Sequence, residues 1–227
     1  SELTGRVLYV DKSALSQYQK DDYLLLDQFD SDSLFTKEKC PVCDAVDLSD
    51  KALILGNKFT QEAKFYYDDG GYGSGQLIGS ESKKAPTISI HNHGTEIRYG
   101  FGNDKIRVGN LKLIEAWHHV AATFDGQDYK LFLDGKEINN SATFQGLTPP
   151  LTEKVDLIGD NTYIGKIDEI RIWNVARTEE QIKSNMDKTL VGDEIGLVAY
   201  YPMEVNNNWE IIDKSRTGNH AQITRAE

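Results

Sequence analysis

One stretch, residues 117–135, constrains the fold of this chain most strongly, because it joins two runs of alternating side chains. Apolar residues recur at every second position in 120–124 and again in 129–133. Strict alternation is typical of strands that place one face on a core. Asp125-Gly126 and Asp134-Gly135 suit turns, since Gly readily adopts positive φ and Asp offers a short acceptor side chain. The stretch therefore predicts an antiparallel hairpin followed by a second turn, and turn chemistry alone would explain both pairs.

Strand-like segments punctuated by Gly, Asp and Asn continue along the rest of the chain. They occur at 51–55, 59–67, 75–80, 87–102, 106–109, 161–173 and 196–203. Strands at this spacing favour an all-β sandwich of two antiparallel sheets over alternating βα units. We expect one domain over residues 1–227, with the polar, Asp-rich region 12–50 as an insertion or a loose region.

One helix is predicted in the segment 177–187, which interrupts the strand pattern. Thr178 is a good N-cap, and Gln181 stands at the spacing of a capping box. Ile182 and Met186 are four residues apart and would face the sandwich. We expect this short helix, in the C-terminal half of the chain, to plug an open edge or end of the core.

The charge of the chain limits the partners that it could bind. The formal net charge is −11, so nucleic acid and acidic membranes would be repelled. No apolar run approaches membrane-spanning length, which argues against membrane insertion. The 36 carboxylates offer many oxygen ligands for a hard cation such as calcium, although a solvated acidic surface is the simpler explanation. The chain also begins without a charged and apolar leader, as expected for a cytoplasmic protein, a processed chain or a domain of a longer protein.

The two cysteines, Cys40 and Cys43, form one C-x-x-C pair. Without a second pair or nearby ligating histidines, this is half a zinc site at best. A redox site would need a strand–helix context that the surrounding polar stretch does not supply. A local disulfide, a pair of free thiols, a metal site and a redox site all stay open.

Several stretches together resemble a known family. "EAWHHVAATFDGQDYKLFLDGKEI" resembles the W-H-H-V-A signature of laminin-G-like jelly rolls in the concanavalin A-like superfamily, as found in bacterial domains. Further elements of that family, in the same order along the chain, are similar to "FTQEAKFYY" upstream of it and to "YIGKIDEIRIWNVARTEEQI" and "LVAYYPM" with "IIDKSRTGNHAQI" downstream. The resemblance covers residues 52–223; it departs at Lys64, where the family usually has Trp, and 12–50 match nothing.

This resemblance implies a jelly roll of two curved antiparallel sheets. It also implies binding of carbohydrate or protein partners, commonly outside the cell, often with calcium, while a minority of the superfamily are glycosidases. Trp117, Trp173, His118 and His119 would serve the strand framework through packing and strand-end hydrogen bonds. Because the fold hosts several functions, the site must decide between them.

Two aspartates are candidate calcium ligands. Asp168 shares a strand face with Ile170 and Ile172 at period two, which would place it at the edge of the core. The resemblance implies that Asp168 binds calcium alongside backbone carbonyls; a purely hydrogen-bonded carboxylate is the alternative. Asp213 is a second candidate, with an Asx-turn as its alternative. On the same strand as Asp168, Arg171 could pair with Glu169.

A sugar site needs aromatic faces beside groups that read hydroxyls. The loop 66–75 combines tyrosines, aspartates and glycines, the turn 91–94 combines two histidines with an amide, and 206–210 places a Trp among polar residues. Each could also be an ordinary solvated turn. The candidate ligand-binding residues are Asp68, Asp69, Tyr72, His91, Asn92, His93 and Trp209.

Catalysis is not predicted. Jelly-roll glucanases place their two carboxylates on one strand face. The segment 59–67 has Glu62 alone, and the adjacent acids Asp168 and Glu169 would point to opposite faces. Nucleophile-elbow, zinc-protease and phosphate-loop motifs are also absent from the sequence.

We therefore expect a noncatalytic, lectin-like module that binds a glycan or glycosylated surface, with structural calcium. It would belong to a larger, multidomain extracellular or cell-surface protein such as an adhesin, a toxin or a polysaccharide-degrading enzyme. The alternative is a protein–protein interaction or structural domain without a sugar site, and a glycosidase is the third possibility. Exposed aromatics at one rim would favour the first, and an apolar patch over a sheet face the second.

Overall fold

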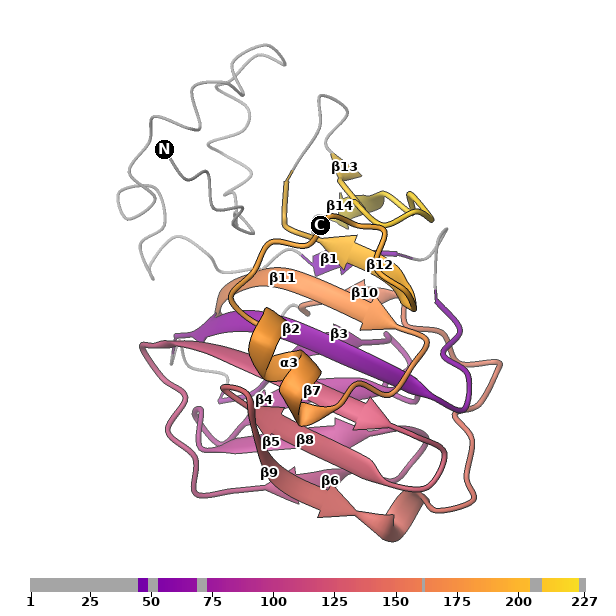
Figure 1. Ribbon diagram of the computed structural model, residues 1–227. Coiled ribbons are helices and arrows are strands. Elements are labelled where there is room, and N and C mark those ends of the chain that lie inside the picture. The colour runs from indigo at the N-terminus through magenta and orange to yellow at the C-terminus, as the bar shows by residue number, and fades with distance from the viewer. Residues whose placement is uncertain (1–44, 49–52, 69–72, 161, 205–209, 225–227) are drawn as a thin grey trace.

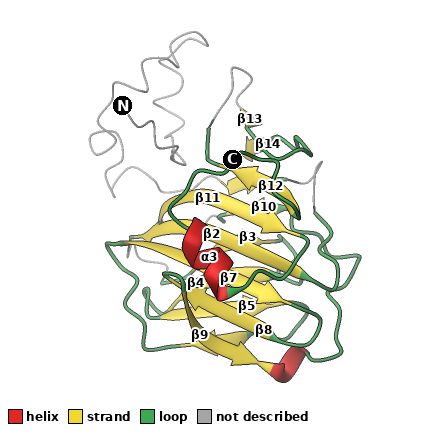
Figure 2. Ribbon diagram, in the orientation of Figure 1, coloured by secondary structure: helices red, strands yellow, loops and turns green. Residues whose placement is uncertain are grey.

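The computed structural model describes residues 45–48, 53–68, 73–160, 162–204 and 210–224. They form two antiparallel sheets, of eight and six strands, that pack face to face as a sandwich (Figure 1). The predicted all-β jelly-roll sandwich with one short α-helix is confirmed for this part of the chain (Figure 2). No helix within it is long and apolar enough to cross a membrane.

Non-consecutive strands lie side by side in both sheets. The eight-stranded sheet has the order β13 (Glu210–Ile211), β14 (Ala221–Thr224), β1 (Ala45–Asp47), β10 (Leu157–Ile158), β3 (Gly75–Gly79), β4 (Thr87–His91), β5 (Glu96–Gly100), β6 (Ile106–Val108). The six-stranded sheet has the order β12 (Leu197–Tyr201), β11 (Gly165–Trp173), β2 (Phe59–Tyr67), β7 (Trp117–Phe124), β8 (Tyr129–Leu133), β9 (Lys136–Ser141). The helical elements are η3 (Ala142–Phe144), a 3-10 turn, and α3 (Glu179–Asn185).

The predicted hairpin of β7 and β8 is present, and its aspartates do more than form turns. Asp134 and Gly135 both have positive φ, as a two-residue type I′ turn requires. The Asp134 carboxylate also lies 2.8 Å from Nδ1 of His118 and accepts a 2.9 Å bond from the backbone N–H of His119. One side chain thus fixes the turn after β8 to the start of β7. At the other turn, Asp125 accepts the backbone N–H groups of the two residues that follow Gly126.

The core between the sheets is rich in aromatic rings. Tyr129 of β8 packs edge-on against Tyr99 of β5, with ring centroids 4.9 Å apart. Phe101 joins the same group through Phe124 and Phe144, at 5.4 Å and 4.5 Å. These contacts bridge both sheets and η3, so large rings fill the sandwich where the predicted alternation points inward.

A bulge in β11 overturns the predicted faces of that strand. Glu169 has φ of 50°, and the pairing with β2 shifts register between Asp168 and Arg171. Because one extra residue is accommodated, Ile167, Ile170 and Ile172 all enter the core. Asp168 therefore faces outward beside its pairing partner Lys64, and the prediction that it shares the face of the two later isoleucines is wrong.

The predicted capping box of α3 is confirmed, but the position predicted for the helix is wrong. Thr178 accepts from the backbone N–H of Gln181, and the Gln181 side chain accepts from that of Thr178. Ile182 is buried with Ala121 of β7 and Phe132 of β8. Since these two residues lie on the outer side of the six-stranded sheet, α3 covers that face rather than plugging an edge (Figure 2).

Each strand segment predicted from residue 59 onward contains an observed strand. The segment 51–55 does not form one within its described residues, because Leu53 makes only an isolated bridge to Val155. The polar strand β9 was missed, since its side chains do not alternate between apolar and polar.

Candidate functional site

The loop 66–75 and the turn 91–94 meet at one end of the sandwich. The backbone N–H of His93 donates to the carbonyl of Gly73 at 3.0 Å. The segment leading into β7 closes the gap between the sheets, because Leu113 N–H donates to Gly94 and Glu115 N–H donates to Tyr67, both at 3.0 Å. We call this end, formed by the described residues of 66–75, 91–95, 110–117 and 160–166, the loop rim.

The backbone of the loop rim is held in an uncommon conformation. Asn92, His93, Asn110 and Glu115 are non-glycine residues with φ between 51° and 60°. The Asn92 carbonyl also accepts from the backbone N–H and the hydroxyl of Thr95, and the Asn92 side-chain amide donates to the Glu96 carboxylate. Left-handed residues of this kind cost free energy and cluster at ligand sites, which marks the rim as a functional candidate.

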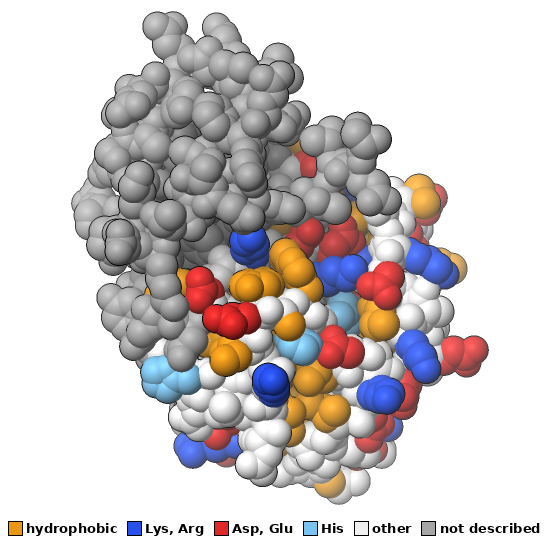
Figure 3. All heavy atoms as spheres, turned by 90° about the vertical axis from the view of Figure 1, so that its left-hand side faces the viewer, with side chains coloured by type: hydrophobic (Ala, Val, Ile, Leu, Met, Phe, Trp, Pro, Cys, Tyr) orange, Lys and Arg blue, Asp and Glu red, His pale blue; other side chains and the backbone are white. Residues whose placement is uncertain are grey.

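An aromatic pair, Trp117 with Tyr66, lies at the outer edge of the rim, and we call it the aromatic platform. Trp117 and Tyr66 are direct cross-strand partners on the outer face of the six-stranded sheet, with ring centroids 6.0 Å apart. Trp117 is 45 % exposed, and Lys166 Nζ lies 5.6 Å from the Tyr66 ring centroid. Trp117 thus lies in the strand framework and packs on Tyr66, as expected, but much of its ring stays exposed; Trp173, 2 % exposed, is covered. Figure 3 views this end of the molecule and shows hydrophobic side chains interspersed with acidic, basic and histidine groups.

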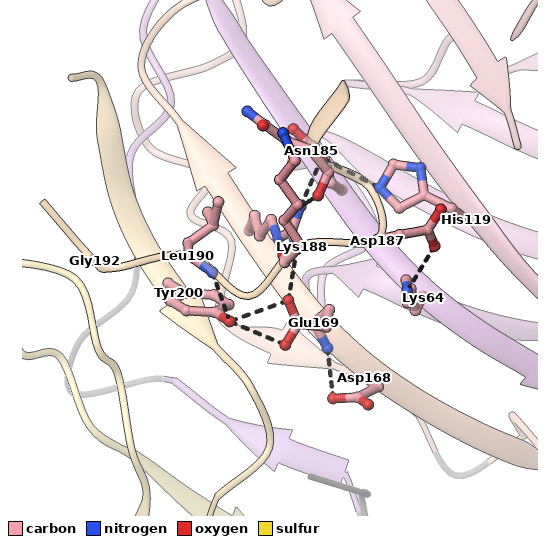
Figure 4. Close-up of polar contacts among 12 residues, drawn as sticks. Lys64, His119, Asp168, Glu169, Asn185, Asp187, Lys188, Leu190, Gly192 and Tyr200 are labelled. Atoms are coloured by element: carbon pink, nitrogen blue, oxygen red, sulfur yellow. Dashed lines mark hydrogen bonds and ion pairs between the residues drawn. The ribbon is translucent and has the colours of Figure 1, made fainter. Parts of the chain in front are cut away.

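The next row along the same face carries Asp168. Its cross-strand partner is Lys64, which forms a 3.0 Å ion pair with Asp187 beyond α3 (Figure 4). One Asp168 oxygen accepts the backbone N–H of Glu169 at 2.7 Å. Burial, reinforced by the charge of Glu169, raises the pKa of Asp168 to about 7. A cation at this carboxylate would offset that cost, so calcium binding here stays a reasonable prediction.

The carboxylate of Asp213 is occupied by protein donors. One oxygen accepts the backbone N–H groups of Tyr200 and Ser215, both within 2.9 Å. The other accepts from the hydroxyls of Ser215 and Thr217 and from the backbone N–H of Asn219, each at 2.9 Å. This pattern is an Asx-turn extended by two hydroxyls. Calcium binding at Asp213 stays a prediction, and it would have to displace these donors.

A buried ion network lies beneath α3. Glu62 is fully buried, with Arg177 Nη1 at 2.9 Å and His119 Nε2 at 3.2 Å from its oxygens. Burial alone would raise the pKa of Glu62, but His119 and the two nearby arginines lower it below its usual value. Arg171 also forms the expected ion pair with Glu169, at 2.6 Å. These contacts join β2, β7, β11 and α3, so they serve the fold.

The remaining predicted residues fall on or near the rim, or outside the described residues. Asp68 lies on the rim, where its N–H donates to Ile164 at 2.9 Å. His91, the first residue of the rim segment 91–95, projects from the outer face of the eight-stranded sheet, with Nε2 3.0 Å from Ser89 Oγ. Within the described part of the chain, no three His, Cys, Asp or Glu side chains are grouped to hold a metal. The predicted residues Asp69, Tyr72, Trp209, Cys40 and Cys43 lie outside it.

Comparison with known proteins gives relatives for part of the chain. Pappalysin-1 of Mus musculus is 31 % identical over 146 residues, which are 56 % of this chain and 9 % of pappalysin-1. Pappalysin-1 of Homo sapiens is 37 % identical over 78 residues, which are 31 % of this chain and 5 % of that protein. The chain thus spans less than a tenth of the length of the curated relatives that it matches.

Solved structures show the same fold. A candidate carbohydrate-binding protein from Bacteroides ovatus superposes with a TM-score of 0.60 at 23 % identity, over 81 % of this chain and 58 % of that chain. A heptameric SAP-like pentraxin from Limulus polyphemus gives 0.50 at 13 % identity, over 63 % and 76 % of the two chains. A laminin-G-type model of the Concanavalin A-like lectin/glucanases superfamily matches residues 43–183. On this match, and on the two-sheet sandwich that carries it, the chain belongs to the laminin-G-type family of that superfamily.

Proposed function

We propose that the chain is a noncatalytic carbohydrate-binding module that holds a glycan at the loop rim. The observation that carries this proposal is the exposed Trp117 ring beside Tyr66, with Lys166 next to them. A sugar ring presents C–H patches that stack on aromatic faces, and its hydroxyls need polar groups at the edge of the stack. Lys166, whose Nζ lies 5.6 Å from the centroid of the Tyr66 ring, supplies such a group beside the pair.

The noncatalytic part of the proposal rests on where the described carboxylates lie. Glu62 is fully buried and bonded to cations, and Glu169 is bonded to Arg171 and Tyr200. A retaining glycosidase needs two carboxylates facing one cleft at close separation. On the face that carries the aromatic platform, Asp168 and the exposed Asp187 both neighbour Lys64, and Asp187 is already joined to it.

Calcium and an extracellular location complete the proposal. Asp168 would be the carboxylate ligand, assisted by backbone carbonyls, and the raised pKa of its carboxyl would fall on binding the cation. The likeness to the fold of a candidate carbohydrate-binding protein supports a glycan-binding role, and the match to a small part of pappalysin-1 supports a place within a larger chain.

The test is a glycan array probed with the purified chain, once with calcium and once with chelator. We expect selective binding to related glycans, weakened about tenfold or more by Trp117→Ala, because central aromatic contacts carry most of the binding energy. Leu151→Ala removes an exposed apolar side chain elsewhere and should leave binding unchanged. If calcium strengthens binding to the native chain but not to Asp168→Asn, the calcium site is supported. Unaltered binding by Trp117→Ala would move the site away from this platform.

A protein-docking role is the second candidate, favoured by one surface. Val191 and Ile195, in the loop before β12, are 82 % and 96 % exposed. Large apolar side chains left in water often mark a contact with another domain or protein. A blank array from correctly folded protein would overturn the glycan proposal and favour this surface instead.

A further inference from the structure

A polar row crosses four strands on the outer face of the eight-stranded sheet. Gln76 of β3 pairs with Ser89 of β4, Ser89 with Arg98 of β5, and Arg98 with Arg107 of β6. Directly paired residues project from the same side of a sheet, with Cβ atoms about 5 Å apart. The alternate residues of β4 and β5 enter the core, so this row faces away from it. We call these four residues the arginine row.

The charges of the arginine row are not balanced within it. Like charges placed directly opposite on neighbouring strands destabilise a sheet. Glu96 accepts from Arg98 at 2.5 Å and offsets one guanidinium. Arg107 is exposed, and no ion pair or hydrogen bond is found for it among the residues that the structure describes. In a chain with a net charge of −11, an arginine without a compensating carboxylate, placed directly opposite another arginine, needs a reason.

The histidine beside the row lies where burial and the two arginines all disfavour its charged form. His91 lies one alternation further along β4, and its cross-strand partner is Glu96. Burial, followed by the charge of Arg98, lowers the pKa of His91 to about 4, and Arg107 acts in the same direction. Glu96 and Asp160 act in the opposite direction but do not cancel this effect.

A neutral donor completes the row at its other end. Gln76 is only 4 % exposed, and its Nε2 has no hydrogen-bond partner within the described part of the chain. Its carboxamide lies over Gly79, where a side chain would collide with it. An unmade hydrogen bond of a buried amide costs free energy, which an acceptor arriving at this face would recover.

We propose that the arginine row binds an acidic saccharide, a sugar that carries a carboxylate or a sulfate. Arg98 and Arg107 present forked donors that match an oxyanion, while Ser89 and Gln76 sit where hydroxyls of the same sugar would lie. A long polyanion such as nucleic acid fits less well, because the rest of the acidic chain would repel it. This site lies on the opposite sheet from the aromatic platform and does not depend on it.

The ligands that test the proposal are trisaccharides that differ in whether they carry a carboxylate, a neutral ester or a sulfate. Calorimetric titration of the chain would use tri-galacturonic acid, its fully methyl-esterified form, and a galactotriose sulfated on one residue. We expect at least one acidic ligand to bind about tenfold or more tightly than the ester, since a lost charged hydrogen bond commonly costs that much. Which acid binds identifies the oxyanion. Equal affinity for acid and ester, or binding of none of the three ligands, would overturn the proposal.

Matched variants assign the binding to the row. Arg107→Gln should weaken the acidic ligand about fivefold or more and leave the ester unchanged, and 0.5 M salt should reproduce most of that loss. Arg216→Gln, on a side chain that is 76 % exposed elsewhere, is the control for general charge. Trp117→Ala should leave acid binding intact. If Arg107→Gln and Arg216→Gln have equal effects, or if Trp117→Ala abolishes acid binding, the arginine row is not the site.

Discussion

The outer faces of the two sheets use arginine in opposite ways. On the six-stranded sheet, Arg171 is fully buried under α3 and the residues that follow it, where it donates to Glu169 and to two backbone carbonyls. On the eight-stranded sheet, Arg107 is exposed at the end of a row that contains Arg98. A buried arginine must be paired, because an unpaired buried charge destabilises the fold, whereas an exposed arginine is solvated and stays available to bind a ligand. The difference separates charges that hold the fold from charges that could recognise a partner.

The largest expected effect on stability is that of replacing Arg171, the buried arginine. Arg171→Met should lower the free energy of unfolding by about 3–5 kcal/mol, because Glu169 and two carbonyls lose a buried donor. Denaturant unfolding of the native chain and the variant measures it. The matched change Arg216→Met, on an exposed side chain 3.5 Å from Asp193, should stay within about 0.5 kcal/mol. Similar losses for the two variants would remove the distinction between covered and uncovered arginines.

An intermediate effect is expected from the uncovered face as the pH falls. His91 takes up its proton near pH 4 when folded but near its ordinary value, about 6.5, when unfolded. The unfolded state therefore binds more protons between these values, and stability is lost as the pH falls through this window. His91→Gln should abolish this loss, which we expect to be about 1–2 kcal/mol given partial exposure.

The measurement is the free energy of unfolding of both chains from pH 7.5 to pH 4. Arg107→Gln should reduce the pH dependence, because it removes one charge that opposes protonation of His91. Parallel pH profiles for the native chain and His91→Gln would show that folding does not lower the pKa of His91.

The smallest effect concerns the helix that covers the six-stranded sheet. Thr178→Ala removes the acceptor of the N-cap and should cost about 1 kcal/mol of stability. Thr178→Ser keeps the hydroxyl and should cost much less. Thermal unfolding of the two variants side by side measures the difference. If both behave like the native chain, α3 is held by Ile182 and the ion network rather than by its cap.

Local patterns in the sequence predicted most of the strands and the helix, although the polar strand β9 was missed. The pairing of strands distant in sequence could not be predicted from them. The alternation in 120–124 and 129–133 and the Thr178–Gln181 spacing each specify structure within a few residues, and both were predicted correctly. The arginine row was not foreseen, because Arg98 and Arg107 meet only through the order of the strands. For the same reason, the contact between His93 and Gly73 could not be read from their separate loops.

The error about Asp168 has a different cause, which is a local exception to alternation. Period two was applied across the whole of β11, but the chain turns left-handed at Glu169 and the pattern restarts one residue later. The exposure of Trp117 was also hidden, since a signature residue gives no sign of whether the neighbouring loop covers it. The face of the sheet that a residue occupies can therefore be predicted from alternation only up to the first bulge in its strand.

The bulge at Glu169 also acts as a phase marker for the chain. Deleting that single residue would restore unbroken alternation and leave Ile167 in the core and Asp168 on the outer face. Straightening the strand with Glu169 retained would instead turn Ile167 to the surface and Asp168 toward the apolar core. Alignments and redesigns of this strand should therefore place any gap at Glu169 and keep the number of residues on each side of it fixed.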